Sequence, residues 1–310
     1  MSFLLGTQSC WLDWESESDP LPTDFLAIPL FAVFFPLIRL FLDRYVFQKL
    51  AGRLILGKGY PSIHLVTREE RKTITKFKES AWKLVYFLSS ELLALYVSHN
   101  EPWFTNTNYF WKGPGDQVWP DLKVELKLKA LYMYGGGFYV YSTFALLFWE
   151  TRRSDFSVSM GHHLATLALL VLSYMARFAR VGAVVLAIHD ATDMFLEAAK
   201  MSRYSGFESL SSIFFASFVV VWTMLRIICF PLWILRSTSS EVVASLDMEK
   251  HAVEGPVYYY MFNTLLICLL IVNIYWWKLM IVMVIDQIKA RGKLGDDIRS
   301  DSEGEDDHVD

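Results

Sequence analysis

The sequence predicts an all-α integral membrane protein with about seven transmembrane helices. Of its 310 residues, 54% are hydrophobic, 16% are aromatic and only 20% are charged, a composition that is unusual for a water-soluble domain of this length. Apolar runs also recur along the chain at about the 20-residue length that a helix needs to cross roughly 30 Å of hydrocarbon. We therefore expect the lipid bilayer to be the solvent of this chain.

Seven segments meet this template to different degrees. The second and fifth carry ionisable residues near their centres, so we expect these two helices to face protein or water and not lipid. The other five are predominantly apolar. In order, the expected spans cover residues 25–43, 81–98, 129–149, 159–179, 181–200, 211–235 and 258–285.

Two features inside these spans predict local geometry. The run Gly135-Gly136-Gly137 in the third span lets two backbones approach closely, which indicates a packing role. Pro231 lies inside the sixth span and should kink it, since proline has no amide hydrogen for the helix.

Charge distribution predicts the orientation. Nine lysines and arginines lie between Arg44 and Lys78, and loops rich in these residues stay on the cytoplasmic side. The prediction is a lumenal N-terminus at 1–24, a first span at 25–43 and a basic cytoplasmic loop at 44–71. An acidic, disordered cytoplasmic tail is expected at 289–310, where Ser300 and Ser302 lie among acids and are candidate phosphorylation sites.

Several classes of function and targeting receive no support. Neither the basic run between Arg44 and Lys78 nor the acidic tail at 289–310 is typical of nucleic-acid binding. Cys10, Cys229 and Cys268 have no metal-like spacing. The polar stretch from Gln8 to Pro20 has no positive region of the kind that opens a cleavable signal peptide.

The candidate chemistry lies in the fourth and fifth spans, because ionisable groups at membrane depth are costly. Asp190, Asp193, Glu197 and Lys200 recur at the spacing of one helical stripe. A rise of about 1.5 Å per residue puts His162 and His163 about 10 to 12 Å from one end of the fourth span, and Asp193 and Asp190 at roughly 12 to 17 Å in the fifth. The two groups are therefore predicted to meet.

These residues fit several kinds of chemistry. Adjacent histidines project about 100° apart on a helix and are poor joint ligands, so no metal is expected. A proton or ion pathway is a second reading. In acyl transfer, a histidine takes a proton or the acyl group while a carboxylate stabilises it. The alternative without function is that these groups only tie two helices together, at about 1 kcal/mol per hydrogen bond. Acyl transfer explains the set best.

The same residues resemble the Lag motif of the TRAM-Lag-CLN (TLC) superfamily, in particular the longevity-assurance ceramide synthases. The Lag motif is expected at about 152–204 and the whole TLC domain at 72–288. The matching residues are Arg152-Arg153-Ser154-Asp155-Phe156, Met160-Gly161-His162-His163, His189-Asp190, Asp193, Leu196-Glu197, Lys200-Met201 and Tyr204. The run Gly113-Pro114-Gly115-Asp116 is similar to the plant branch, and no homeobox-like insert is present.

The resemblance implies a six-helix TLC bundle preceded by one N-terminal span. It implies acylation of a sphingoid long-chain base by a fatty acyl-CoA in the endoplasmic reticulum membrane, with acyl-CoA as co-substrate and no permanently bound cofactor. The expected partners are these two substrates and membrane lipid, with no nucleic acid, and homo- or heterodimers are left open. The alternative is a non-catalytic TLC protein that binds, senses or transports lipid.

The resemblance and the spacing together assign roles to the residues. The expected catalytic residues are His162, His163, Asp190 and Asp193. Supporting roles are expected for His189, Glu197 and Lys200, and acyl-CoA contacts for Arg152, Arg153 and Arg203.

Overall fold

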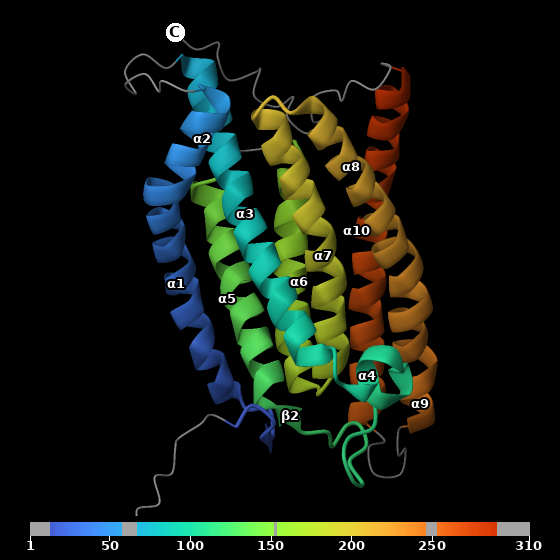
Figure 1. Ribbon diagram of the computed structural model, residues 1–310. Coiled ribbons are helices and arrows are strands. Elements are labelled where there is room, and N and C mark those ends of the chain that lie inside the picture. Colours follow the sequence, from blue (N-terminus) through green and yellow to red (C-terminus); the bar gives the residue numbers. More distant parts are fainter. Residues whose placement is uncertain (1–12, 58–66, 152–153, 246–252, 290–310) are drawn as a thin grey trace, which may run out of the picture.

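The computed structural model describes residues 13–57, 67–151, 154–245 and 253–289, in which long helices run side by side in one bundle (Figure 1). Each of the seven expected spans is helical over most of its length. The long helices are α1 Ala27–Leu42, α3 Arg68–Ser98, α5 Leu126–Phe148, α6 Phe156–Met175, α7 Ala179–Tyr204, α8 Glu208–Trp222 and α10 Glu254–Lys289.

The first helix is longer than expected. It continues through a π-helical turn, η2 (Asp43–Phe47), into α2 (Gln48–Ile55), so much of the segment expected to be a loop at 44–71 is helical instead. Phe47 and Ala51 are buried in one apolar cluster with Phe77 of α3, and burial of this face stabilises the extra turns. α3 also begins earlier than expected, at a capping box formed by Thr67 and Glu70.

The sixth expected span is made of several helical pieces. α8 continues into a π-helical stretch, η5 (Thr223–Leu235), followed by η6 (Ser237–Glu241) and α9 (Val242–Ser245). Pro231 lies inside η5, and it cannot donate a backbone hydrogen bond. The irregularity expected at this proline therefore takes the form of wider helical hydrogen bonding.

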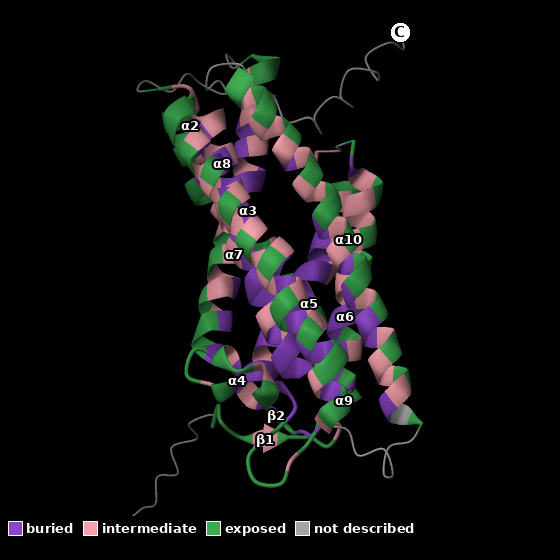
Figure 2. Cartoon of the chain, turned by 90° about the vertical axis from the view of Figure 1, so that its right-hand side faces the viewer, coloured by how far each residue is buried: buried purple, intermediate pink, exposed green. Residues whose placement is uncertain are grey.

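Four helical segments of the described chain are long and apolar enough to cross a membrane, namely Pro22–Ile55, Phe156–Met175, Glu208–Ser245 and Gly255–Lys289. The chain is thus a multi-pass membrane protein. α3, α5 and α7 do not meet the same criterion, and they carry most of the polar residues of the bundle interior. Figure 2 shows buried residues along the inside of the bundle and exposed ones on the outer faces of the helices. Seven membrane crossings remain a prediction.

The glycine run in α5 does allow close packing, as predicted. A Cβ at Gly137 would collide with Cβ of Phe31 and lie 3.2 Å from the backbone nitrogen of Ala32, both in α1. A Cβ at Gly136 would lie 2.9 Å from the side chain of Ile28. α1 can therefore approach the α5 backbone only because these positions have no side chain.

One end of the bundle, here called the cap end, is closed by loops and short elements. β1 (Glu17–Ser18) pairs antiparallel with β2 (Val124–Glu125), while η1 (Pro22–Leu26), α4 (Pro102–Thr105) and η4 (Thr107–Phe110) lie beside them. The buried aromatic residues of this end include Trp103, Trp111 and Trp119. The opposite end, where α6 begins and α7 ends, is here called the mouth end.

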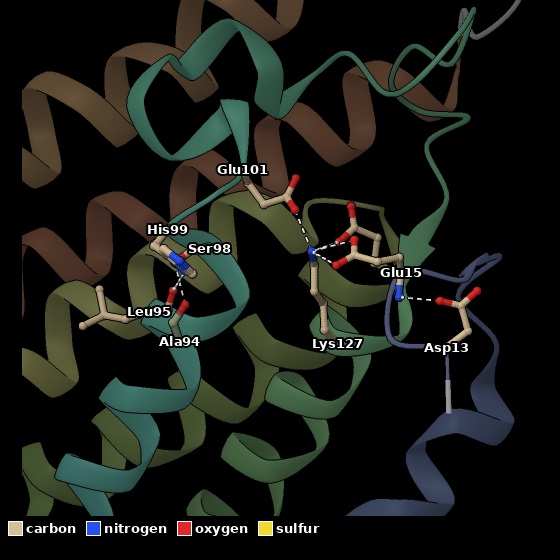
Figure 3. A network of polar contacts seen from close by, with 9 residues as sticks. Asp13, Glu15, Ala94, Leu95, Ser98, His99, Glu101 and Lys127 are labelled. Carbon is tan, nitrogen blue, oxygen red and sulfur yellow. Dashed lines mark hydrogen bonds and ion pairs between the residues drawn. The ribbon is translucent and has the colours of Figure 1, made fainter. Parts of the chain in front are cut away.

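A buried lysine joins the N-terminal segment to the cap end (Figure 3). Nζ of Lys127 lies 2.9 Å from Glu15, 2.6 Å from Glu101 and 3.1 Å from Glu125. In the described parts of the chain, these three glutamates are the one group of three potential ligands close enough to hold a metal ion. An ammonium group already lies among their oxygens, so we interpret the cluster as a set of structural ion pairs.

Candidate active site

A cavity of about 330 Å³ extends from the mouth end into the bundle. α3, α5, α6, α7, α8, η5 and α10 all contribute to its wall. His162 and His163 of α6 and Asp193 of α7 line it together. Of the four residues that the depth estimate put at one level, these three line one cavity.

The two histidines point to different walls of the cavity. The ring of His162 packs edge-on against Trp276 of α10, with 5.2 Å between the ring centres. The ring of His163 packs edge-on against Tyr139 of α5, with 5.8 Å between the ring centres. Nδ1 of each ring is buried and has no hydrogen-bond partner among the described residues. Both imidazoles therefore have a nitrogen that is not engaged in holding the fold.

Asp193 is held by an arginine that sequence reasoning missed. Arg226 of η5 donates to Oδ1 of Asp193 at 2.7 Å and to the backbone oxygen of His189 at 2.6 Å. Its guanidinium group also lies 3.8 Å from the centre of the Trp222 ring, a cation–π contact. A lone arginine within the apolar run 211–235 was the available signal, since charges at membrane depth mark functional sites.

Asp190 does not share the cavity with the histidines. Its Oδ2 accepts a hydrogen bond from Oγ of Ser90 in α3 at 2.6 Å, and the residue is 1% exposed. Lys83 and Phe87 of α3, nearer the mouth, line the cavity, whereas Ser90 and Asp190 do not. The carboxylate at the deeper position is therefore enclosed between two helices.

His189 is held inside the bundle by contacts at both ring nitrogens. Its Nδ1 lies 2.7 Å from the backbone oxygen of Val185, and Nδ2 of Asn273 in α10 lies 3.3 Å from its Nε2. A carbonyl can only accept, so Nδ1 carries the proton and Nε2 accepts from the amide. Both nitrogens of His189 are thus in use, one with Val185 and one with Asn273.

Charged residues surround the outer part of the cavity. Lys200 donates to Glu197 at 2.7 Å within α7, and Lys83 of α3 pairs with Glu150 at 2.6 Å. Arg203 lines the same region. Three sets of predicted residues, Arg152 with Arg153, the acidic tail, and Ser300 with Ser302, lie outside the described residues.

Residues 76–282 match the model of the TRAM_LAG1_CLN8 family, described as the TLC domain. The chain belongs to the TLC-domain family. Ceramide synthase 1 LOH3 of Arabidopsis thaliana is 63% identical to this TLC-domain protein over 96% of the chain and 97% of the relative. The ASC1-like protein of Solanum lycopersicum is 62% identical over 98% and 99%, and Ceramide synthase LOH1 of Arabidopsis thaliana is 56% identical over 96% and 97%.

Proposed function

We propose that this TLC-domain protein is a ceramide synthase, an acyl-CoA-dependent acyltransferase that acylates the amine of a sphingoid long-chain base. Relatives that carry this name are 56% and 63% identical over nearly their whole length. The structural observation that carries the proposal is the cavity in which His162, His163 and Asp193 meet inside a membrane bundle. Two lipid substrates need such a site, and proton transfer needs such groups.

The proposed orientation puts the mouth end in the cytosol, the N-terminus in the lumen and the protein in the endoplasmic reticulum membrane. Basic residues at the mouth support this orientation, because positive segments stay cytoplasmic. Lys200 and Arg203 line the mouth, and we propose that they contact the phosphates of acyl-CoA together with Arg152 and Arg153. Homo- or heterodimer formation and phosphorylation of Ser300 and Ser302 remain predictions.

In the proposed reaction, the amine nitrogen of the base bonds to the thioester carbonyl carbon and the carbon–sulfur bond breaks. The amine proton passes to an imidazole and then to the departing CoA thiolate, which leaves as the thiol. His162 acts as the base or as a transient acyl acceptor, and His163 orients it. Thioester aminolysis is downhill, so the protein mainly aligns the reactants, removes a proton and excludes water. No permanent cofactor or metal is required by this scheme.

The Asp193–Arg226 pair supplies the fixed charges of the site. Asp193 lies on the wall shared with the histidines and can stabilise an imidazolium as it forms. Asp190 and His189 act indirectly in this proposal, because their bonds to Ser90 and Asn273 fix α7 against α3 and α10. Glu197 and Lys200 extend the polar face of α7 toward the mouth.

The test is an assay of purified protein with acyl-CoA and a sphingoid base, in which ceramide and free CoA are measured. The His162→Ala, His163→Ala and Asp193→Ala variants should insert normally and lose acyl transfer. Cys229→Ala and Cys268→Ala are matched controls, since neither sulfur contacts the cavity, and should retain it. Full activity in all three site variants would refute the proposed mechanism. Lipid movement across vesicles without consumption of acyl-CoA would instead support a transport protein.

A further inference from the structure

A second, narrow pocket of about 40 Å³ continues from the cavity toward the cap end, and we call it the inner pocket. It lies among α5, α6, α7 and α10, and its apolar wall includes Leu169, Leu266 and Phe262. His162 and Tyr139 line both the cavity and the inner pocket. These two side chains therefore form the neck between the two spaces.

The position of the neck sets the direction of the substrate. The phosphates of acyl-CoA are anionic and stay near water and the basic residues of the mouth, since a charge is costly at membrane depth. The thioester carbonyl must then reach the imidazole of His162. The part of the acyl chain beyond that carbonyl points away from the mouth, and the inner pocket lies in that direction.

The wall of the inner pocket follows the direction of a lipid chain. Its lining residues on α6 extend from His162 to Ser173, over which the helix rises about 16 Å at 1.5 Å per residue. This distance is close to half of the roughly 30 Å hydrocarbon thickness, which is the depth of one leaflet. The pocket is narrow and apolar, so it accepts methylene groups and excludes a polar head group.

The floor of the inner pocket is firmly supported. Phe262 stacks on Phe178 with 4.3 Å between the ring centres. Phe178 in turn packs edge-on against two tryptophans, with ring-centre distances of 5.3 Å to Trp111 and 5.1 Å to Trp119. A Cβ at Gly182 on the opposite wall would collide with the hydroxyl group of Tyr132. Close-packed walls do not yield to an extra methylene without strain, so this floor limits how far a chain can extend.

We propose that the inner pocket holds the distal methylenes of the fatty acyl chain and that Leu169, Leu266 and Phe262 set its maximum length. This inference rests on the proposed function and adds a determinant of substrate specificity to it. A methylene that gains or loses a buried position changes discrimination about fourfold, so a two-carbon difference changes it more than tenfold. Side-chain volume at these three positions should therefore control the preferred product.

The test is a competition assay in which microsomes receive an equimolar series of saturated acyl-CoAs that differ by two carbons, with one sphingoid base. Leu266→Ala and the milder Phe262→Leu should raise the share of longer ceramides, by about tenfold for the larger truncation. Leu169→Phe should shift the products to shorter chains. The matched control is Ile267→Ala, beside Leu266 on α10 but 49% exposed on the outer face, which should leave the distribution unchanged.

Two results would overturn this inference. One is an unchanged chain-length distribution in every active pocket variant. The other is loss of acyl transfer in all three pocket variants while Ile267→Ala stays active, because the pocket would then serve packing alone. Failure of the unaltered protein to form any ceramide would instead refute the proposed function, so the two failures can be distinguished.

Discussion

Replacing Arg226 with methionine removes the positive charge that Asp193 contacts across the interface between α7 and η5. Arg226 is 2% exposed, and the side chain of Asp193 is 25% exposed. Removing one partner of a buried ion pair costs about 3 to 5 kcal/mol, and the partial exposure of Asp193 puts the expected loss near the lower figure. For a chain of 310 residues, about 3 kcal/mol corresponds to a fall of roughly 5 °C in the unfolding midpoint, because the unfolding entropy is about 2.1 cal/mol/K per residue.

A double-variant cycle separates the interaction energy of the Arg226–Asp193 pair from the effect of changing each side chain alone. Asp193→Asn should also be destabilising, because it leaves the Arg226 charge unpaired. The variant that carries both changes should be more stable than the sum of the two losses predicts, since no unpaired charge remains. Arg236→Met is the matched control, as Arg236 is exposed on the same run of helix and its replacement should cost under about 0.5 kcal/mol.

The readout is the thermal unfolding midpoint of each purified variant in the same detergent, together with acyl transfer. Equal midpoints for Arg226→Met and Arg236→Met would contradict the importance of the buried pair. Strict additivity in the cycle would contradict direct coupling between Arg226 and Asp193. A stable Arg226→Met protein with unaltered acyl transfer would remove this arginine from the proposed site.

Two further predictions concern packing and the cap end. Gly137→Ala should lower the unfolding midpoint by an amount equivalent to about 1 to 3 kcal/mol, because its methyl group meets the backbone of α1. Gly135→Ala is the control and should not lower it, since a Cβ at Gly135 makes only an ordinary 3.7 Å contact with Leu186. Equal midpoints for the two variants would contradict the packing argument. Burial raises the pKa of the Glu125 carboxyl above its ordinary 4.5, although the contact with Lys127 acts against this shift. At pH above the raised pKa the ionised carboxyl opposes folding, whereas at pH below 4.5 the carboxyl is neutral and does not. Glu125→Gln should therefore stabilise the protein increasingly as pH rises from about 4 to 7, measured as the difference in unfolding midpoint from the unaltered protein, and a difference that shrinks with rising pH would refute it.

The helices were predictable because the bilayer imposes both their length and their composition. Apolar runs located all seven long helices, including α3 and α7, which are too polar to qualify as spans by hydropathy alone. Helix ends were less predictable, since η2 and α2 depend on burial of Phe47 and Ala51 against α3. Periodicity in one segment does not reveal contacts with a distant one.

The sequence predicted how deep the candidate site residues lie along their helices, but only partly which of them face the cavity. Rise per residue placed His162, His163 and Asp193 at one level, and they share one cavity. The same reasoning could not exclude Asp190, three residues from Asp193 on the same stripe. Asp190 is bonded to Ser90 of α3 and is buried, and only tertiary packing determines such a contact.

Position at the cavity, together with bonding, separates the ionisable groups available for chemistry from those that hold the helices together. Both nitrogens of His189 are engaged, whereas Nδ1 of His162 and of His163 has no partner in the described chain. A buried polar group without a partner costs about 1 to 3 kcal/mol. Oδ1 of Asp190 also lacks a partner in the described chain, but Asp190 does not line the cavity, whereas His162 and His163 do. The Lag motif therefore combines two kinds of residue. His162, His163 and Asp193 face the space where the substrates meet, while Asp190 and His189 fix the helix that carries Asp193.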